Sequence, residues 1–196
     1  MGIFRKLYRE ARDILGMKPP AENETQLAER VCDEVKSELG GKKTQEGEDW
    51  KLVTNQGGRS VEIVFDAAGA RALFSIPSNL EDGPTFIVHF DASGGKDPAP
   101  RGAVRIKIGS SIFLEGPKGE AETQEQMWKA LPTGTRANLS GLVTKYQGPF
   151  GYDESTFRFA PETQTLVGPS AKYNVKMQLT SLLKLCDEIE TAWNAL

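Results

Sequence analysis

Long apolar runs are missing from this 196-residue sequence, and so are clusters of cysteine or histidine. A transmembrane helix needs about 18 or more consecutive apolar residues, so we expect no membrane-spanning segment. The hydrophobic fraction of 38% is still enough for a folded core, which excludes a wholly disordered chain. A formal charge of -3 argues against a chain whose whole surface is basic and binds nucleic acid.

The chain has two cysteines, Cys32 and Cys186, and one histidine, His89. Two cysteines in a chain of this length do not form a disulfide framework. Zinc needs several Cys, His or carboxylate ligands, usually close together, and these three residues are far apart in the sequence. We therefore predict no metal site and no cofactor. Both cysteines fall on apolar helix faces, which predicts two small buried side chains.

The glycine-rich loops do not match the known phosphate-binding patterns. Gly40-Gly41-Lys42 lacks the preceding strand of a phosphate-binding loop, and Gly94-Gly95-Lys96 lacks the following helix. The first residues contain no continuous apolar stretch of the kind found in a secretory signal. We therefore expect a reduced, cytoplasmic protein.

The N-terminal segment 3–15 predicts an amphipathic helix, because its apolar residues recur at the spacing that places them on one face. Cations outnumber acids along it, and Lys18-Pro19-Pro20 cannot continue a helix. We interpret residues 1–20 as a helix and linker attached to a single domain that spans 1–196. This arm has three alternative docking sites: its own sheet, a protein partner or an anionic membrane surface. The residues expected to make that contact are Ile3, Phe4, Leu7, Arg5 and Arg9.

A second helix is predicted at about 25–39, and the polar tract from Lys42 to Asp49 is interpreted as a linker. Asn23 and Gln26 have the spacing of a capping box before this helix. From Trp50 onward the period of the apolar residues changes from about 3.6 to about 2, which indicates strands. Alternation is clear over 60–66, 71–76, 85–90 and 104–108, and a tight turn leads from the last of these into a strand at 111–115.

The C-terminal part mixes both periods. A short helix is predicted at 121–131, a strand at 136–146 with Gly141 as a bulge, a loop at 147–152 and a strand at 156–160. The last segment predicts a long helix, because apolar residues follow one another at alternating intervals of four and three. That stripe is formed by Val175, Leu179, Leu182, Cys186, Ile189 and Trp193.

Short turns between strands imply antiparallel pairing, because a parallel crossover needs a dozen or more residues. We therefore predict an α+β fold with a mainly antiparallel sheet of about six to eight short strands. The N-terminal and C-terminal helices are expected to pack on one face of that sheet.

One candidate site lies in the sheet region. Arg101, Arg105 and Lys107 give residues 96–118 a local positive charge, and Arg105 and Lys107 share one strand face. With Phe150 and Tyr152 as nearby aromatic residues, this pattern is typical of surfaces that hold single-stranded nucleic acid or another anion. The acidic total of the chain weighs against that alternative.

The sequence favours a non-enzymatic binding or interaction protein, because it shows neither a metal cluster nor a clear nucleophile–base pair. A protein partner or a second copy of the chain is the expected partner. Two alternatives stay open. One is single-stranded nucleic-acid binding on the basic strand face. The other is an enzyme that uses His89 or carboxylates in a cleft beside the loops 91–102 and 147–155.

Overall fold

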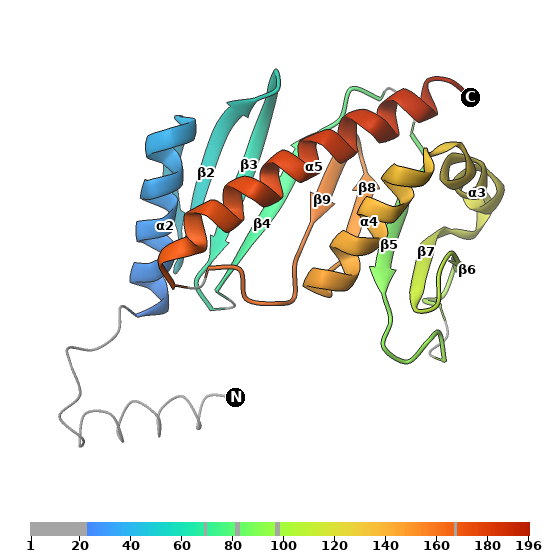
Figure 1. The fold of residues 1–196 in the computed structure, drawn as a ribbon, viewed down its shortest axis with the longest axis horizontal. Coiled ribbons are helices and arrows are strands. Elements are labelled where there is room, and N and C mark those ends of the chain that lie inside the picture. Colours follow the sequence, from blue (N-terminus) through green and yellow to red (C-terminus); the bar gives the residue numbers. More distant parts are fainter. Residues whose placement is uncertain (1–22, 69, 81–82, 97–98, 167) are drawn as a thin grey trace.

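The computed structural model describes residues 23–68, 70–80, 83–96, 99–166 and 168–196 (Figure 1). The arm predicted over 1–20, with Ile3, Phe4, Leu7, Arg5 and Arg9, lies outside the described residues. The described part is α+β, as predicted. Its helices are α2 (Glu24–Leu39), α3 (Ala121–Ala130), α4 (Thr133–Tyr146) and α5 (Ala171–Trp193).

One nine-stranded antiparallel sheet runs through the molecule, in the order β1-β2-β3-β4-β9-β8-β5-β7-β6. The sheet has slightly more strands than the six to eight predicted, and every pair in it is antiparallel. The strands are β1 (Lys42–Glu46), β2 (Asp49–Gln56), β3 (Arg59–Asp66), β4 (Arg71–Pro77), β5 (Phe86–Phe90), β6 (Ala103–Lys107), β7 (Ile112–Pro117), β8 (Phe150–Asp153) and β9 (Thr156–Phe159).

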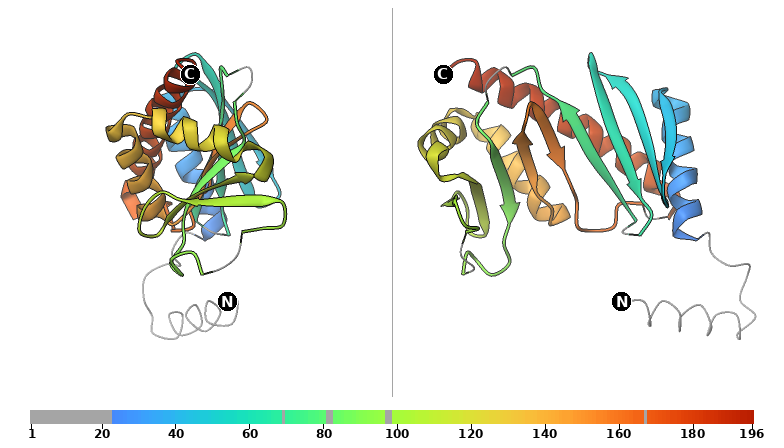
Figure 2. Two further views of the ribbon diagram at one scale, coloured as in Figure 1. Left: turned by 90° about the vertical axis from the view of Figure 1, so that its right-hand side faces the viewer. Right: turned by 180° about the vertical axis from the view of Figure 1, so that it is seen from behind.

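Helices cover one face of this sheet. Figure 1 shows α2, α4 and α5 lying in front of the strands, and the view from behind in Figure 2 shows none of these three helices over the opposite face. The alternation along β3 explains the two faces, since Val61, Ile63 and Phe65 are buried while Ser60 is exposed. The core therefore lies between the sheet and the helices, and we call the other side the open face.

Helix α5 confirms the predicted apolar stripe. Val175, Leu179, Leu182, Cys186 and Ile189 are all buried in the common core. Helix α2 begins at the predicted capping box, in which the side chains of Asn23 and Gln26 each accept a hydrogen bond from the other's backbone N–H. Both cysteines are free and buried, as expected. No helix among the described residues combines the length and hydropathy that a membrane span requires.

The strand predicted at 136–146 is wrong, because these residues form most of α4. The buried side chains of α4 are Thr135, Leu139, Leu142 and Val143, a spacing of four, three and one that belongs to a helix. The apparent slip of strand alternation at Gly141 came from this helical period. No bulge exists there.

Two further predictions are corrected by strand pairing. The tract 42–49, interpreted as a linker, contains β1, which pairs with β2 so that Thr44 lies opposite Lys51. Its exposed edge needs few apolar residues, so no alternation marks it. The loop predicted at 147–152 contains the start of β8, where Phe150 and Tyr152 point into the core.

Candidate functional site

Five strands place a row of side chains across the open face. Arg105 on β6 lies opposite Glu115 on β7, and Glu115 lies opposite Ile87 on β5. Ile87 lies in turn opposite Gly151 on β8, which pairs with Arg158 on β9. Residues that are far apart in the sequence therefore stand side by side, because antiparallel pairing fixes which of them share a face.

A hollow of about 260 Å³ lies on this row beside Ile87. Its lining includes Gly151, which has no side chain, together with Pro149 and Arg158. Ile87 is 42% exposed, which is unusual for a large aliphatic side chain. The hollow and this exposed side chain together form an apolar recess.

Two further hollows continue the recess along β5, with volumes of about 200 and 350 Å³. The first shares Ile87 and Pro149 with the apolar recess, and the two share His89, Arg105 and Glu162 with each other. We call the three hollows together the β5 groove. One end of this groove is apolar, and the other end is lined by charged side chains.

The charged end is organised around Arg105. Its Nε donates to Glu115 Oε2 at 2.8 Å and its Nη1 donates to Asp91 Oδ2 at 3.2 Å. Hydrogen bonds from Ser93 and from the backbone N–H of Gly95, together with Arg105, hold the pKa of Asp91 below its ordinary value against the opposing effect of burial. The cation of Arg105 is thus already engaged by two carboxylates.

His89 and Glu162 each bring a polar side chain to this charged end. His89 Nε2 lies 3.6 Å from Glu115 Oε2, and it has no hydrogen-bond partner among the described residues. Glu162 lines the groove and forms no ion pair with another described residue. The charged end therefore carries three carboxylates against one guanidinium, which favours a cationic ligand group or another hydrogen-bond donor.

Gly95, in the loop that follows β5, packs on the ring of Phe113 of β7. A Cβ at Gly95 would stand 2.6 Å from Cζ of the Phe113 ring, so the backbone of the loop lies directly on that ring. The φ of Gly95 is +86°, a conformation that L side chains rarely adopt. Phe113 is only 4% exposed as a result.

The structure separates the residues predicted for nucleic-acid binding. Arg105 lines the groove, whereas Arg101 and Lys107 are exposed outside it. Phe150 and Tyr152 are 0% and 3% exposed on the covered face, where their rings pack on other core aromatics. These rings are not available for base stacking, because the alternation along β8 turns them away from the strand face that carries Arg105.

Sequence reasoning missed Ile87, Gly151 and Glu162 as parts of this site. The alternation on β5 placed Ile87 and His89 on the same strand face, and no sequence signal linked Gly151 or Glu162 to them. Among the described residues no group of His, Cys, Asp or Glu has the arrangement of a metal site. Within the described part of the chain, no serine, threonine or cysteine forms a hydrogen bond with His89 Nε2, as a nucleophile–base pair through that atom would need.

No protein-family model matches the chain, and no curated protein matches it. Its fold is similar to the crystal structure of the mycobacterial trehalose monomycolate transport factor A, TtfA, with a TM-score of 0.51. The two chains are 13% identical, and the similarity covers 87% of this chain and 96% of TtfA. At this identity the similarity shows a shared fold.

Proposed function

We propose that this chain is a non-enzymatic binding module that holds a segment of a partner protein in the β5 groove. The segment carries an apolar side chain for the recess beside Ile87 and a basic side chain for the charged end. The observation that supports this most directly is the continuity of the groove from exposed Ile87 to the uncompensated carboxylate of Glu162.

The length and charge of the groove support a polypeptide ligand. The five residues of β5 lie along it, which corresponds to roughly 17 Å at about 3.4 Å per residue. An extended segment of similar length fits along such a strand, and a Lys or Arg side chain can pair with the carboxylate of Glu162. A nucleic acid would meet three carboxylates at the same place, so we do not propose one.

The comparison and the cysteines agree with this proposal. TtfA is named a transport factor, and a module that binds its ligand without converting it is compatible with such a name. We propose that the chain binds its partner in the cytoplasm, because both cysteines are free thiols in the structure and disulfides are rare in that compartment.

Two labelled peptides of equal length test the proposal by fluorescence anisotropy. One alternates leucine with lysine, and the other alternates leucine with glutamate. The leucine–lysine peptide should bind saturably, and Ile87→Asp should weaken it by about tenfold or more, because burying an isoleucine contributes roughly 1.5–3 kcal/mol. Glu162→Lys should weaken it as well, and more so at low salt.

Matched controls sit away from the groove. Ser60→Asp places the same new charge at an exposed position of β3, and Glu48→Lys reverses the charge of an exposed turn residue. Both variants should bind like the unaltered protein. Equal binding by Ile87→Asp and Ser60→Asp, or saturable substrate turnover that is abolished by His89→Gln, would refute the proposed function.

A further inference from the structure

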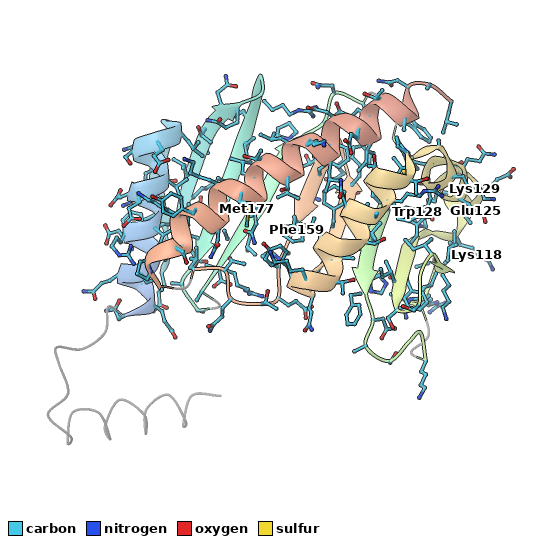
Figure 3. The ribbon with its side chains drawn as sticks, viewed as in Figure 1. Lys118, Glu125, Trp128, Lys129, Phe159 and Met177 are labelled. Carbon is cyan, nitrogen blue, oxygen red and sulfur yellow. The ribbon has the colours of Figure 1, made fainter. Side chains whose placement is uncertain are left out.

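A second groove lies on the helical side of the molecule, between α4 and α5. It has a volume of about 350 Å³, with Leu142 and Leu185 among its apolar lining residues. One end is tied by Thr135 Oγ1 of α4, which donates to Glu188 Oε2 of α5 at 2.8 Å. In Figure 3, Met177 on α5 and Phe159 on β9 mark this side of the molecule. We call it the α4–α5 groove.

Small residues leave this groove open. Gly141 lies in the middle of α4, and a Cβ built on it meets nothing within 4 Å. Glycine inside a helix costs about 1 kcal/mol relative to alanine, yet neither packing nor backbone conformation requires it here. Ser181 on α5 also lines the groove. The missing side chain therefore creates space beside the α5 surface.

A buried amide is the second, independent observation. Gln178 on α5 is 2% exposed and lines the α4–α5 groove, and neither Nε2 nor Oε1 has a hydrogen-bond partner among the described residues. Leaving such groups unpaired is costly, since buried polar groups are normally hydrogen-bonded. A ligand that supplies both an acceptor and a donor satisfies this amide, and one peptide unit does so with its C=O and N–H.

The rim of the α4–α5 groove carries two lysines and a flexible methionine. Lys145 forms no ion pair with a described residue, and Lys184 is 70% exposed with Glu188 at 3.7 Å as its paired carboxylate. Met177 is 52% exposed at the same groove, and its flexible side chain can move to admit a ligand. The rim thus presents two cations to an incoming segment.

We infer that the α4–α5 groove binds a polypeptide segment of a partner protein, with an apolar side chain over Gly141, a peptide unit on Gln178, and acidic residues at Lys145 and Lys184. The site lies on the covered side of the sheet and has the opposite charge preference to the β5 groove. It therefore stands independently of the function proposed above.

The leucine–glutamate peptide described above is the probe. It should bind saturably, and Gly141→Leu should weaken it by about tenfold or more, because the leucine fills the space of the apolar anchor. Gly141→Ala is the matched control and should keep the affinity within about threefold. Both variants should unfold at higher temperature than the unaltered protein, so a loss of binding in Gly141→Leu cannot be attributed to misfolding.

Gln178→Met tests the unpaired amide separately. It should raise the thermal midpoint of the free protein, because it removes an unpaired polar group, and it should weaken the acidic peptide. Lys184→Glu should weaken the acidic peptide as well, whereas Ile87→Asp should affect the leucine–lysine peptide alone. The inference is overturned if the acidic peptide does not bind, if it binds Gly141→Leu unchanged, or if Gln178→Met lowers the midpoint and so reveals a partner for the amide.

Discussion

The buried ion pair of Arg59 makes the sharpest prediction about stability. Its Nη1 and Nη2 donate to the two carboxylate oxygens of Glu190 at 2.6 and 2.7 Å, and both residues are 6% exposed. Nη2 also donates to Asp187 at 2.6 Å, and Nη1 donates to the carbonyl oxygen of Pro77 at 2.9 Å. One guanidinium thus ties α5 to the start of β3 and to the end of β4.

Arg59→Met should lower the free energy of unfolding by about 3–5 kcal/mol at neutral pH, because it leaves the carboxylate of Glu190 buried without its cation. The remaining donors to Glu190 Oε1 are the Ser78 hydroxyl at 2.9 Å and the Asn79 backbone N–H at 2.8 Å. Neither group carries charge, so they do not replace the guanidinium.

Urea unfolding followed by circular dichroism measures this difference. The matched control is Arg158→Met, because Arg158 pairs with Asp153 at the surface and both side chains are about half exposed. That variant should change the free energy of unfolding by less than about 1 kcal/mol. A loss below about 1 kcal/mol in Arg59→Met, with an unchanged denaturant slope, would show that the buried pair does not hold α5 in place.

The same pair predicts a pH dependence. Burial acts to raise the pKa of Glu190, but hydrogen bonds from Arg59, Asn79 and Ser78 outweigh it and hold the pKa below its ordinary value. Since the folded-state pKa is lowered, the stabilisation is present above the unfolded pKa of about 4.3 and is lost as the pH falls through the folded value. Glu190→Gln should therefore be less stable than the unaltered protein at pH 7, and this difference should shrink below pH 4. A constant difference across that range would contradict the argument.

Three further predictions concern the core and the loop over Phe113. Leu182→Ala should cost about 2–5 kcal/mol in urea unfolding, since Leu182 is 0% exposed, and a loss below about 0.5 kcal/mol would mean that the stripe of α5 is not packed. Burial raises the pKa of the Cys32 thiol to about 11 and raises that of Cys186 further, so neither should react with a thiol reagent at pH 8 until the protein unfolds. Rapid labelling of the folded protein would contradict this. Gly95→Ala should destabilise by at least about 1 kcal/mol and increase proteolysis in 91–102, because its Cβ meets the Phe113 ring at positive φ. Unchanged cleavage would show that the loop does not rest on that ring.

Local periodicity determined much of the fold. The spacing of apolar residues in α5 and the alternation in β3 both reflect a buried face with a regular repeat. This repeat is visible in the sequence of each segment alone, without knowledge of the elements that pack against it. The same analysis of periodicity failed for residues 136–146, which end at Tyr146 and were predicted as a strand. The segment that ends at this residue has several polar and small residues on its exposed side, which makes its helical period hard to tell from an interrupted strand.

The candidate site was only partly visible in the sequence. Alternation placed Arg105 and Lys107 on one strand face, and it placed Ile87 with His89 on another, because these are neighbours two residues apart. Nothing in the sequence brought Gly151 beside Ile87, since β5 and β8 are separated by two strands and two helices of chain.

The sequence by itself determined which residues are buried within most elements, because burial repeats along a helix or strand with a fixed local period. Only the tertiary structure decided which elements lie next to each other. Pairing of β5 with β8 built the β5 groove, and the approach of α4 to α5 enclosed the amide of Gln178. Such contacts depend on the register between distant segments, which no single segment encodes.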